Sequence, residues 1–296
     1  MFRSSAAPAP LVKRRGFVIL VTAPKGGTGK SSTALNMAAF LGLRLRSSGR
    51  TVCIVDANTQ QADTGKYLQA YTPDITALAR DPAGQTPERI QEFLLRREEL
   101  NLSALLGPAL AIDASPYFIN PGLYNRAVDL LRLHFDYIII DSPVAELFHP
   151  MFMEFALPQA DFIMVPISPN VATMMNTDAW LHNITQPKYA GGPGVDPGII
   201  GIVLNRFEDE IDFTEDKAQE ELAGWTYIGA IPESKEWKAA NNRADLVVTY
   251  NIPEINDAFS HILYYITGEP ALLEGHTRIT PQKSSLLSRL KSAIGR

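Results

Sequence analysis

A glycine-rich loop flanked by lysines is the part of this sequence that could most directly do chemistry. It reads Pro24-Lys-Gly-Gly-Thr-Gly-Lys-Ser-Ser32, between an apolar run and a helix-forming run. Glycines let the backbone turn its N–H groups around phosphates, and a helix N-terminus adds partial positive charge. In such a loop Lys30 neutralises the β- and γ-phosphates, and the Ser31 hydroxyl ligates Mg²⁺. The sequence therefore predicts a nucleoside-triphosphate and Mg²⁺ site formed by Lys25, Gly26, Gly27, Thr28, Gly29, Lys30, Ser31 and Ser32.

The loop also has an unusual lysine ahead of its glycines. Lys25 precedes Gly26, and Pro24 stands where the common pattern has glycine. The string Lys-Gly-Gly-x-Gly-Lys-Ser resembles the deviant P-loop of the ParA/MinD family of ATPases. This resemblance implies an ATP-sandwiched homodimer in which Lys25 reaches the partner's phosphates and Lys30 acts within its own subunit. It covers about residues 16–265.

Three further segments resemble the same family, in the expected order. Phe135–Pro143 resembles its Walker B strand, and Asp141 would lie at the ligand-binding edge of the sheet, where it can hold a magnesium-bound water. Gly201–Arg206 resembles the strand whose asparagine, here Asn205, reads the adenine edge. The segment 229–233 resembles the base-side loop, and Pro232 is its counterpart in this chain.

One segment departs from the family pattern. The family usually reads Asp-x-Asp here, and its second Asp is associated with positioning the attacking water, whereas this chain has Asp56-Ala-Asn58. A carboxamide can orient water through its carbonyl but cannot take a proton. We therefore expect a catalytic set of Lys25, Lys30, Asp56 and Asn58 with slow turnover, or a switch that mainly binds nucleotide. The run 56–63 also resembles the TadZ/CpaE branch, which localises pilus-assembly machinery.

Short apolar runs alternate with longer amphipathic stretches from Gly16 onward. The runs are nearly continuous in Val, Ile and Leu, which predicts a parallel sheet covered on both faces. The predicted strands are Phe17–Thr22, Val52–Asp56, Tyr137–Asp141, Phe162–Pro166, Ile199–Asn205 and Tyr227–Pro232. The predicted helices are Lys30–Leu45, Pro87–Arg97, Pro121–His134, Asn170–Ile184 and Pro253–Ile266. The expected fold is α/β and doubly wound, with a mostly parallel sheet flanked by helices.

The composition changes at both ends of this region. Residues 1–15 predict a flexible basic arm, 16–268 the P-loop ATPase domain, 269–283 a linker, and 284–296 an amphipathic basic helix. Residues 1–55 contain nine Lys/Arg and no acid, and residues 275–296 contain five and no acid. Basic ends on an acidic body indicate contact with a polyanion, with solvated tails as the plain alternative.

The predicted C-terminal helix indicates which polyanionic surface the protein contacts. Arg289 and Lys291 flank an apolar stripe formed by Leu286, Leu287, Leu290, Ala293 and Ile294. This suits an interfacial helix on an anionic membrane, and a helix docked on the protein itself or on a partner is the alternative. We expect a cytoplasmic, MinD-like ATPase, peripheral at the inner membrane, that positions cargo. The cargo and the activating protein stay unidentified. Alternatives are a ParA-type partition ATPase on nonspecific DNA at the nucleoid, and a pseudo-ATPase scaffold.

Other chemistries are excluded by composition. Cys53 is the single cysteine, so an iron–sulfur cluster, a cysteine-rich metal site and an internal disulfide are not expected. The five histidines lie far apart in sequence, which argues against zinc. The glycine loop lacks the Gly-x-Gly-x-x-Gly of a dinucleotide oxidoreductase. No signal peptide or membrane-spanning run is recognisable, in keeping with the cytoplasmic expectation.

Overall fold

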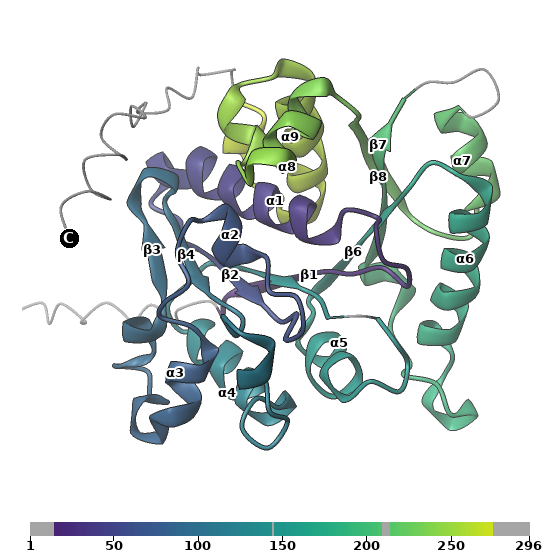
Figure 1. Ribbon diagram of the computed structural model, residues 1–296. Coiled ribbons are helices and arrows are strands. Elements are labelled where there is room, and N and C mark those ends of the chain that lie inside the picture. Colours follow the sequence, from purple (N-terminus) through teal and green to yellow (C-terminus); the bar gives the residue numbers. More distant parts are fainter. Residues whose placement is uncertain (1–14, 144, 209–213, 275–296) are drawn as a thin grey trace, which may run out of the picture.

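One eight-stranded sheet organises the computed structural model, which describes residues 15–143, 145–208 and 214–274 (Figure 1). The strand order is β3-β4-β2-β5-β1-β6-β7-β8, and every neighbouring pair is parallel except β3 with β4. The strands are β1 Phe17–Val21, β2 Val52–Asp56, β3 Leu95–Arg97, β4 Leu102–Leu105, β5 Tyr137–Asp141, β6 Phe162–Ile167, β7 Ile200–Phe207 and β8 Tyr227–Pro232. The expected doubly wound, mostly parallel fold is therefore confirmed.

Helices cover both faces of this sheet, as Figure 1 shows. One face packs against α1, α8 and α9, and the other against α3, α4, α5, α6 and α7. The helices are α1 Lys30–Leu45, α2 Thr64–Tyr67, α3 Ile75–Arg80, α4 Pro121–Leu131, α5 Leu157–Gln159, α6 Val171–Thr185, α7 Glu215–Glu221, α8 Lys235–Arg243 and α9 Pro253–Thr267. A π-helical turn, Met151–Ala156, leads into α5. Two hydrophobic cores result, one on each side of the sheet.

Local sequence explains where several helices begin. Asn120 precedes α4 and accepts the backbone N–H of Leu123, while Pro121 occupies the first helical position. Asn170 precedes α6 and accepts the N–H of Thr173 in the same way. Capping residues thus fix the starts that hydrophobic periodicity places only approximately. The predicted helix Pro121–His134 ends earlier than expected, at Leu131.

The predicted helix Pro87–Arg97 is wrong. This segment forms a short 3₁₀ turn, Ile90–Phe93, followed by strand β3. Leu94 packs into the core on one side of the sheet and Leu95 into the core on the other. Adjacent side chains pointing to opposite faces require a strand, because a helix would place them on neighbouring parts of one surface. Antiparallel pairing with β4 therefore prevailed over the helical start predicted from Thr86-Pro87-Glu88.

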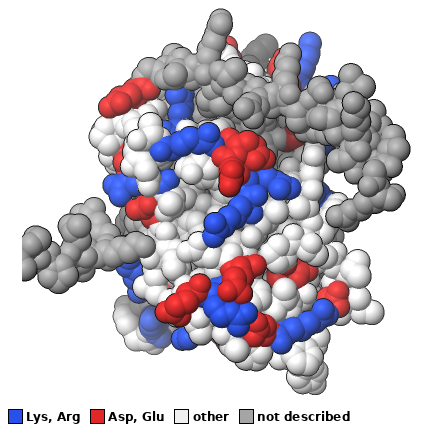
Figure 2. Space-filling view, turned by 90° about the vertical axis from the view of Figure 1, so that its left-hand side faces the viewer, with Lys and Arg blue, Asp and Glu red and all other residues white. Residues whose placement is uncertain are grey.

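Strand β3 is also an exposed edge of the sheet. On the face that includes this edge, charges of both signs are interspersed (Figure 2). Arg96, Glu98 and Glu99 are exposed there, and Arg97 lies 3.9 Å from Glu99. A short edge strand bearing such charges resists pairing with a further strand.

The two terminal predictions lie almost entirely outside the described residues. Of the basic arm 1–15, only Arg15 is described, and the helix 284–296 with its stripe Leu286, Leu287, Leu290 and Ile294 is not described. Within the predicted linker 269–283 the described part is 269–274, and Pro270–Leu272 forms a 3₁₀ turn there. These domain assignments stay predictions.

Candidate nucleotide site

The glycine loop connects β1 to α1, as predicted. Gly27 and Gly29 have φ of +81° and +84°, a left-handed backbone that glycine adopts without steric cost. The carbonyl of Gly29 accepts the N–H of Thr33 at 2.8 Å, and no side chain caps the start of α1. The N–H groups of the first helical turn therefore face an anion site without an internal competitor.

Asn205 holds this loop from the neighbouring part of the sheet. Its side-chain nitrogen donates to the carbonyl of Thr28 at 2.7 Å, and both residues are buried. A Cβ added at Gly29 would lie under 3.0 Å from that nitrogen, so only glycine fits. The side-chain oxygen of Asn205 has no hydrogen-bond partner among the described residues. This oxygen is therefore the atom that would make the predicted contact with adenine, because it can accept a hydrogen bond from the exocyclic amine.

Two carboxyl groups meet at the same edge of the sheet. Asp56 and Asp141 are direct neighbours in the register of β2 and β5, and both are fully buried. Asp56 accepts the N–H groups of Asn58 and Thr64 at 3.0 and 3.1 Å. Burial nevertheless raises the pKa of Asp56 to about 6. Burial and the neighbouring Asp56 raise the pKa of Asp141 well above its usual value, while Ser31 and Lys30 oppose that rise.

The arrangement around Asp141 fits a divalent cation. Neither of its carboxylate oxygens has a hydrogen-bond partner among the described residues, although both are buried. Buried carboxylates without partners are costly, and a cation or its bound water would satisfy them. The described residues contain no group of three or more His, Cys, Asp or Glu side chains able to hold a metal. Most of the Mg²⁺ ligands would therefore come from nucleotide phosphates and water.

The two lysines of the loop differ sharply in environment. Lys30 is partly buried, and burial lowers its pKa while the charge of Asp141 opposes that change. Lys25 is exposed and makes no hydrogen bond or ion pair with any described residue. Lys30 therefore lies within the field of the Asp141 charge, and Lys25 lies at the surface.

The two serines that follow Lys30 also differ. Ser31 is partly exposed, whereas Ser32 is buried and its hydroxyl donates to Asn241 of α8 at 2.9 Å. Tyr67 of α2 donates to the same amide oxygen at 3.1 Å. Ser32 can therefore serve a phosphate only through its backbone N–H.

Asn58 lies beside the acids but its side chain is already engaged. Its side-chain oxygen accepts the N–H of Gln61 at 3.2 Å, which closes a turn after β2. Asp63, at the end of this turn, forms an ion pair with Lys66 at 2.6 Å. One of the two lone pairs of the Asn58 side-chain oxygen is therefore engaged within the chain, and the carboxamide cannot take a proton from water.

Pro232, predicted to lie on the base side, and Arg206, which was not predicted, are found at the ends of β8 and β7. Pro232 ends β8 opposite Phe207, at the same edge of the sheet as the loop. Arg206, which the sequence patterns did not single out, is partly buried, and its guanidinium lies 3.7 Å from the Cβ position of Gly29. Its position directly after Asn205 was the one feature of the sequence from which it could have been predicted.

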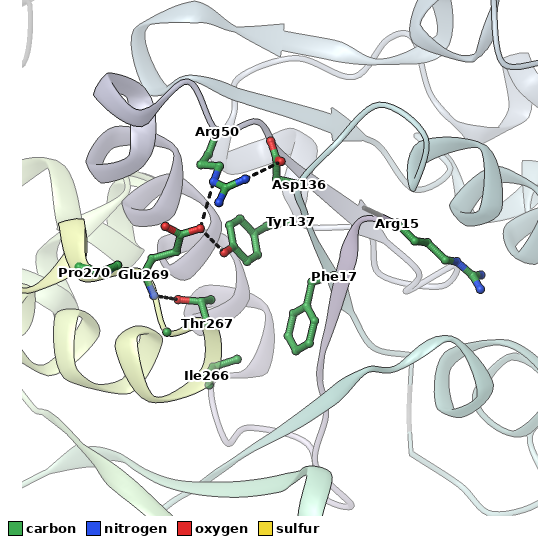
Figure 3. A pocket seen from close by; sticks show the side chains of 10 residues that line it. Arg15, Phe17, Arg50, Asp136, Tyr137, Ile266, Thr267, Glu269 and Pro270 are labelled. Atoms are coloured by element: carbon green, nitrogen blue, oxygen red, sulfur yellow. Dashed lines mark hydrogen bonds and ion pairs between the residues drawn. The ribbon is translucent and has the colours of Figure 1, made fainter. Parts of the chain in front are cut away.

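A separate pocket of about 550 Å³ opens at the opposite edge of the sheet, where β1 and β5 begin (Figure 3). Arg50 lies 3.0 Å from Glu269 and 3.2 Å from Asp136, and Tyr137 donates to Glu269 at 2.6 Å. These groups satisfy one another's charges and fasten the chain after α9 to the sheet. We interpret this pocket as structural.

Comparison with known proteins identifies the family. Residues 19–247 match the family described as the CobQ/CobB/MinD/ParA nucleotide binding domain. The chain belongs to this family. It is 28% identical over 267 residues to the septum site-determining protein MinD of Thermotoga maritima, covering 88% of this chain and 91% of that protein. It is 28% identical over 214 residues to the chromosome partitioning protein ParA of Myxococcus xanthus, covering 71% of each.

Solved structures of the family share the fold. MinD of Pyrococcus horikoshii, determined in complex with Mg-ADP, superposes with a TM-score of 0.66 at 20% identity, covering 85% of this chain and 96% of that one. A ParA family ATPase of Chlorobium tepidum gives a TM-score of 0.68 at 17% identity, covering 83% and 97%. The resemblance inferred from the P-loop is therefore confirmed at the level of family and fold. In the described part of the chain, no helix is long and apolar enough to cross a bilayer.

Proposed function

We propose that this protein is an ATP-dependent dimerising ATPase that positions cellular cargo. The observation that carries the proposal is the buried, unpartnered carboxyl group of Asp141 beside Lys30 and Ser31. Lys30 and the open N–H groups of α1 would bind the phosphates, and Asp141 would hold a water of the Mg²⁺ ion. A bound Mg²⁺ supplies charge neutralisation between the β- and γ-phosphates.

The exposed Lys25 supports a homodimer. A lysine at the mouth of the loop, without a partner among the described residues, is positioned to reach phosphates bound by a second subunit. Exposed apolar side chains occur in the loop 107–120, which begins beside Asp56; they are Leu110, Ile112, Tyr117 and Phe118. An apolar surface next to the site is typical of a contact with another protein.

Two lysine variants test this assignment. Lys30→Ala should abolish nucleotide binding, because Lys30 lies inside the loop. Lys25→Ala should retain most ADP affinity but lose ATP-dependent dimerisation, measured by calorimetry and by light scattering. Equal loss of ADP affinity in both variants would show that Lys25 acts within its own subunit.

The attachment surface is proposed from the sequence of the C-terminal segment. A short amphipathic helix binds membranes weakly alone, and two copies on one dimer make the second insertion intramolecular, which can strengthen attachment by ~10²–10⁴-fold. The protein should sediment with anionic liposomes with ATP and much less with ADP. Deletion from Ser284 and Leu287→Glu should each abolish this. If wild-type protein does not sediment with liposomes but retards DNA in a gel when ATP is present, the attachment surface is nonspecific DNA and not the membrane.

A second candidate is a nucleotide-binding switch of the TadZ/CpaE kind with slow or no hydrolysis. Asn58 favours it, because its carboxamide cannot take a proton from the attacking water. Phosphate release measured with and without liposomes or DNA separates the two candidates. Turnover that stays undetectable under all conditions, with intact ATP binding, favours the switch.

A further inference from the structure

Arg206 interrupts the regular pairing of β7 with β8. Asn205 pairs with Ile231 and Phe207 pairs with Pro232, so Arg206 is left without its own register partner. Its φ is +60°, a left-handed backbone that non-glycine residues adopt only when the surroundings enforce it. Bulges of this kind change the direction of a side chain and are common beside active sites.

The bulge directs the Arg206 side chain across the start of α1. One guanidinium nitrogen lies 3.7 Å from the Cβ position of Gly29. Burial raises the pKa of Tyr67, and the positive charge of Arg206 is among the influences that oppose that rise. Tyr67 in turn shares an acceptor with Ser32. The guanidinium therefore lies beside Gly29, the residue directly before the first turn of α1.

This cation makes no hydrogen bond or ion pair with any described residue, although it is partly buried. Partial burial of a guanidinium is unfavourable unless an acceptor satisfies its donors. The neighbouring N–H groups of α1 form an anion site, and a planar guanidinium binds phosphate oxygens in a bidentate way. The surroundings of Arg206 are thus those of a phosphate-binding residue.

We propose that Arg206 binds the α-phosphate of the nucleotide, opposite Lys30. Lys30 is expected to serve the β- and γ-phosphates, whereas Arg206 lies on the side of Asn205, where the base is expected. This inference rests on the proposed ATP site and adds to it a contact that ATP and ADP share. It therefore sets affinity for both nucleotides rather than the difference between them.

The test is the ADP affinity of full-length Arg206→Gln, measured by calorimetry with Mg²⁺ at low and high salt. Loss of a charge-assisted hydrogen bond should weaken ADP binding by about 10- to 100-fold. The difference from wild type should shrink at high salt, because salt screens a partly exposed ionic contact. Arg96→Gln is the matched control, since Arg96 is exposed on β3 at the far edge of the sheet.

A second variant separates binding from folding. Arg206→Gly relieves the left-handed backbone, so it should unfold at the same or a higher temperature than wild type and still lose ADP affinity. Unchanged ADP affinity in both Arg206 variants would overturn the inference. A loss independent of salt would also overturn it, because the contact would then be to the base.

These outcomes are distinct from those that test the proposed function. ADP affinity is measured on the protein whether or not it dimerises. Wild-type protein that binds ADP but never dimerises with ATP refutes the dimerising switch and leaves the role of Arg206 standing. If Arg206→Gln dimerises normally and binds ADP as wild type does, the role of Arg206 is refuted and the dimerising switch stands.

Discussion

Replacing the three loop glycines one at a time should give three different losses of stability. A Cβ at Gly26 meets nothing within 4 Å and its backbone is not left-handed, so Gly26→Ala should change the free energy of unfolding by less than about 0.5 kcal/mol. Gly27→Ala also has open space but a φ of +81°, which should cost about 1–2 kcal/mol. Gly29→Ala adds displacement of Asn205 from the carbonyl of Thr28, worth a further ~1–3 kcal/mol.

Thermal and urea unfolding of the nucleotide-free protein measure these differences. For a chain of this size each kcal/mol corresponds to roughly 2–4 °C in Tm. The double variant Gly29→Ala/Asn205→Ala should lose less stability than the sum of the losses in the two single variants. Without the Asn205 side chain, the Cβ at position 29 has nothing to clash with. Equal losses for Gly27→Ala and Gly29→Ala, or additive losses in the double variant, would refute the role assigned to Asn205.

Three further predictions concern the acids, the hydrolysis segment and α1. The pKa of Asp56 is raised from 3.8 to about 6, so its neutral form is favoured in the folded state. The contribution of this group to ligand-free stability is therefore present below about pH 4 and is lost as the pH rises through about 6, and urea titrations of Asp56→Asn should show a smaller loss over this range. Asn58→Asp should raise ATP turnover, by up to ~10²–10⁴-fold, in a phosphate-release assay. An unchanged rate with intact folding would show that Asn58 is not limiting. Gly42→Ala should lower the free energy of unfolding in urea by about 1–3 kcal/mol without loss of ADP affinity. The added Cβ would lie under 3.0 Å from the carbonyl oxygens of Leu100 and Asn101. An unchanged free energy of unfolding would contradict the close packing of α1 on that turn.

The central strands could be predicted because each is a continuous apolar run with both faces covered. The position of Asp141 at the ligand-binding edge was likewise expected, because strands of such a sheet end there, but the direct pairing of Asp56 with Asp141 was not predicted. The segment containing Leu94 and Leu95 was predicted as a helix, because a single pair of adjacent apolar residues does not distinguish the two periods. Its partner β4 has four residues and was missed as well.

The finer features of the site depend on tertiary contacts that no local pattern specifies. The hydrogen bond from Asn205 to Thr28 joins residues 177 positions apart. The left-handed backbone at Arg206 arises from a register shift between β7 and β8, which the sequence of β7 alone does not encode. The engagement of Asn58 by Gln61 depends on the turn geometry after β2. Each was therefore visible only in the folded chain.

The position of β1 in the middle of the sheet has a consequence for the lifetime of the protein. Strands β2 and β5 on one side bring the acids, and β7 on the other brings Asn205, so a nucleotide bound as proposed would touch both halves of the sheet. Such a ligand acts as a non-covalent crosslink, and at 100 times its Kd it stabilises the native state by about 2.7 kcal/mol. A depleted nucleotide pool would then expose more of the chain to proteases. The amount of this protein in the cell should therefore follow energy supply, independently of its synthesis.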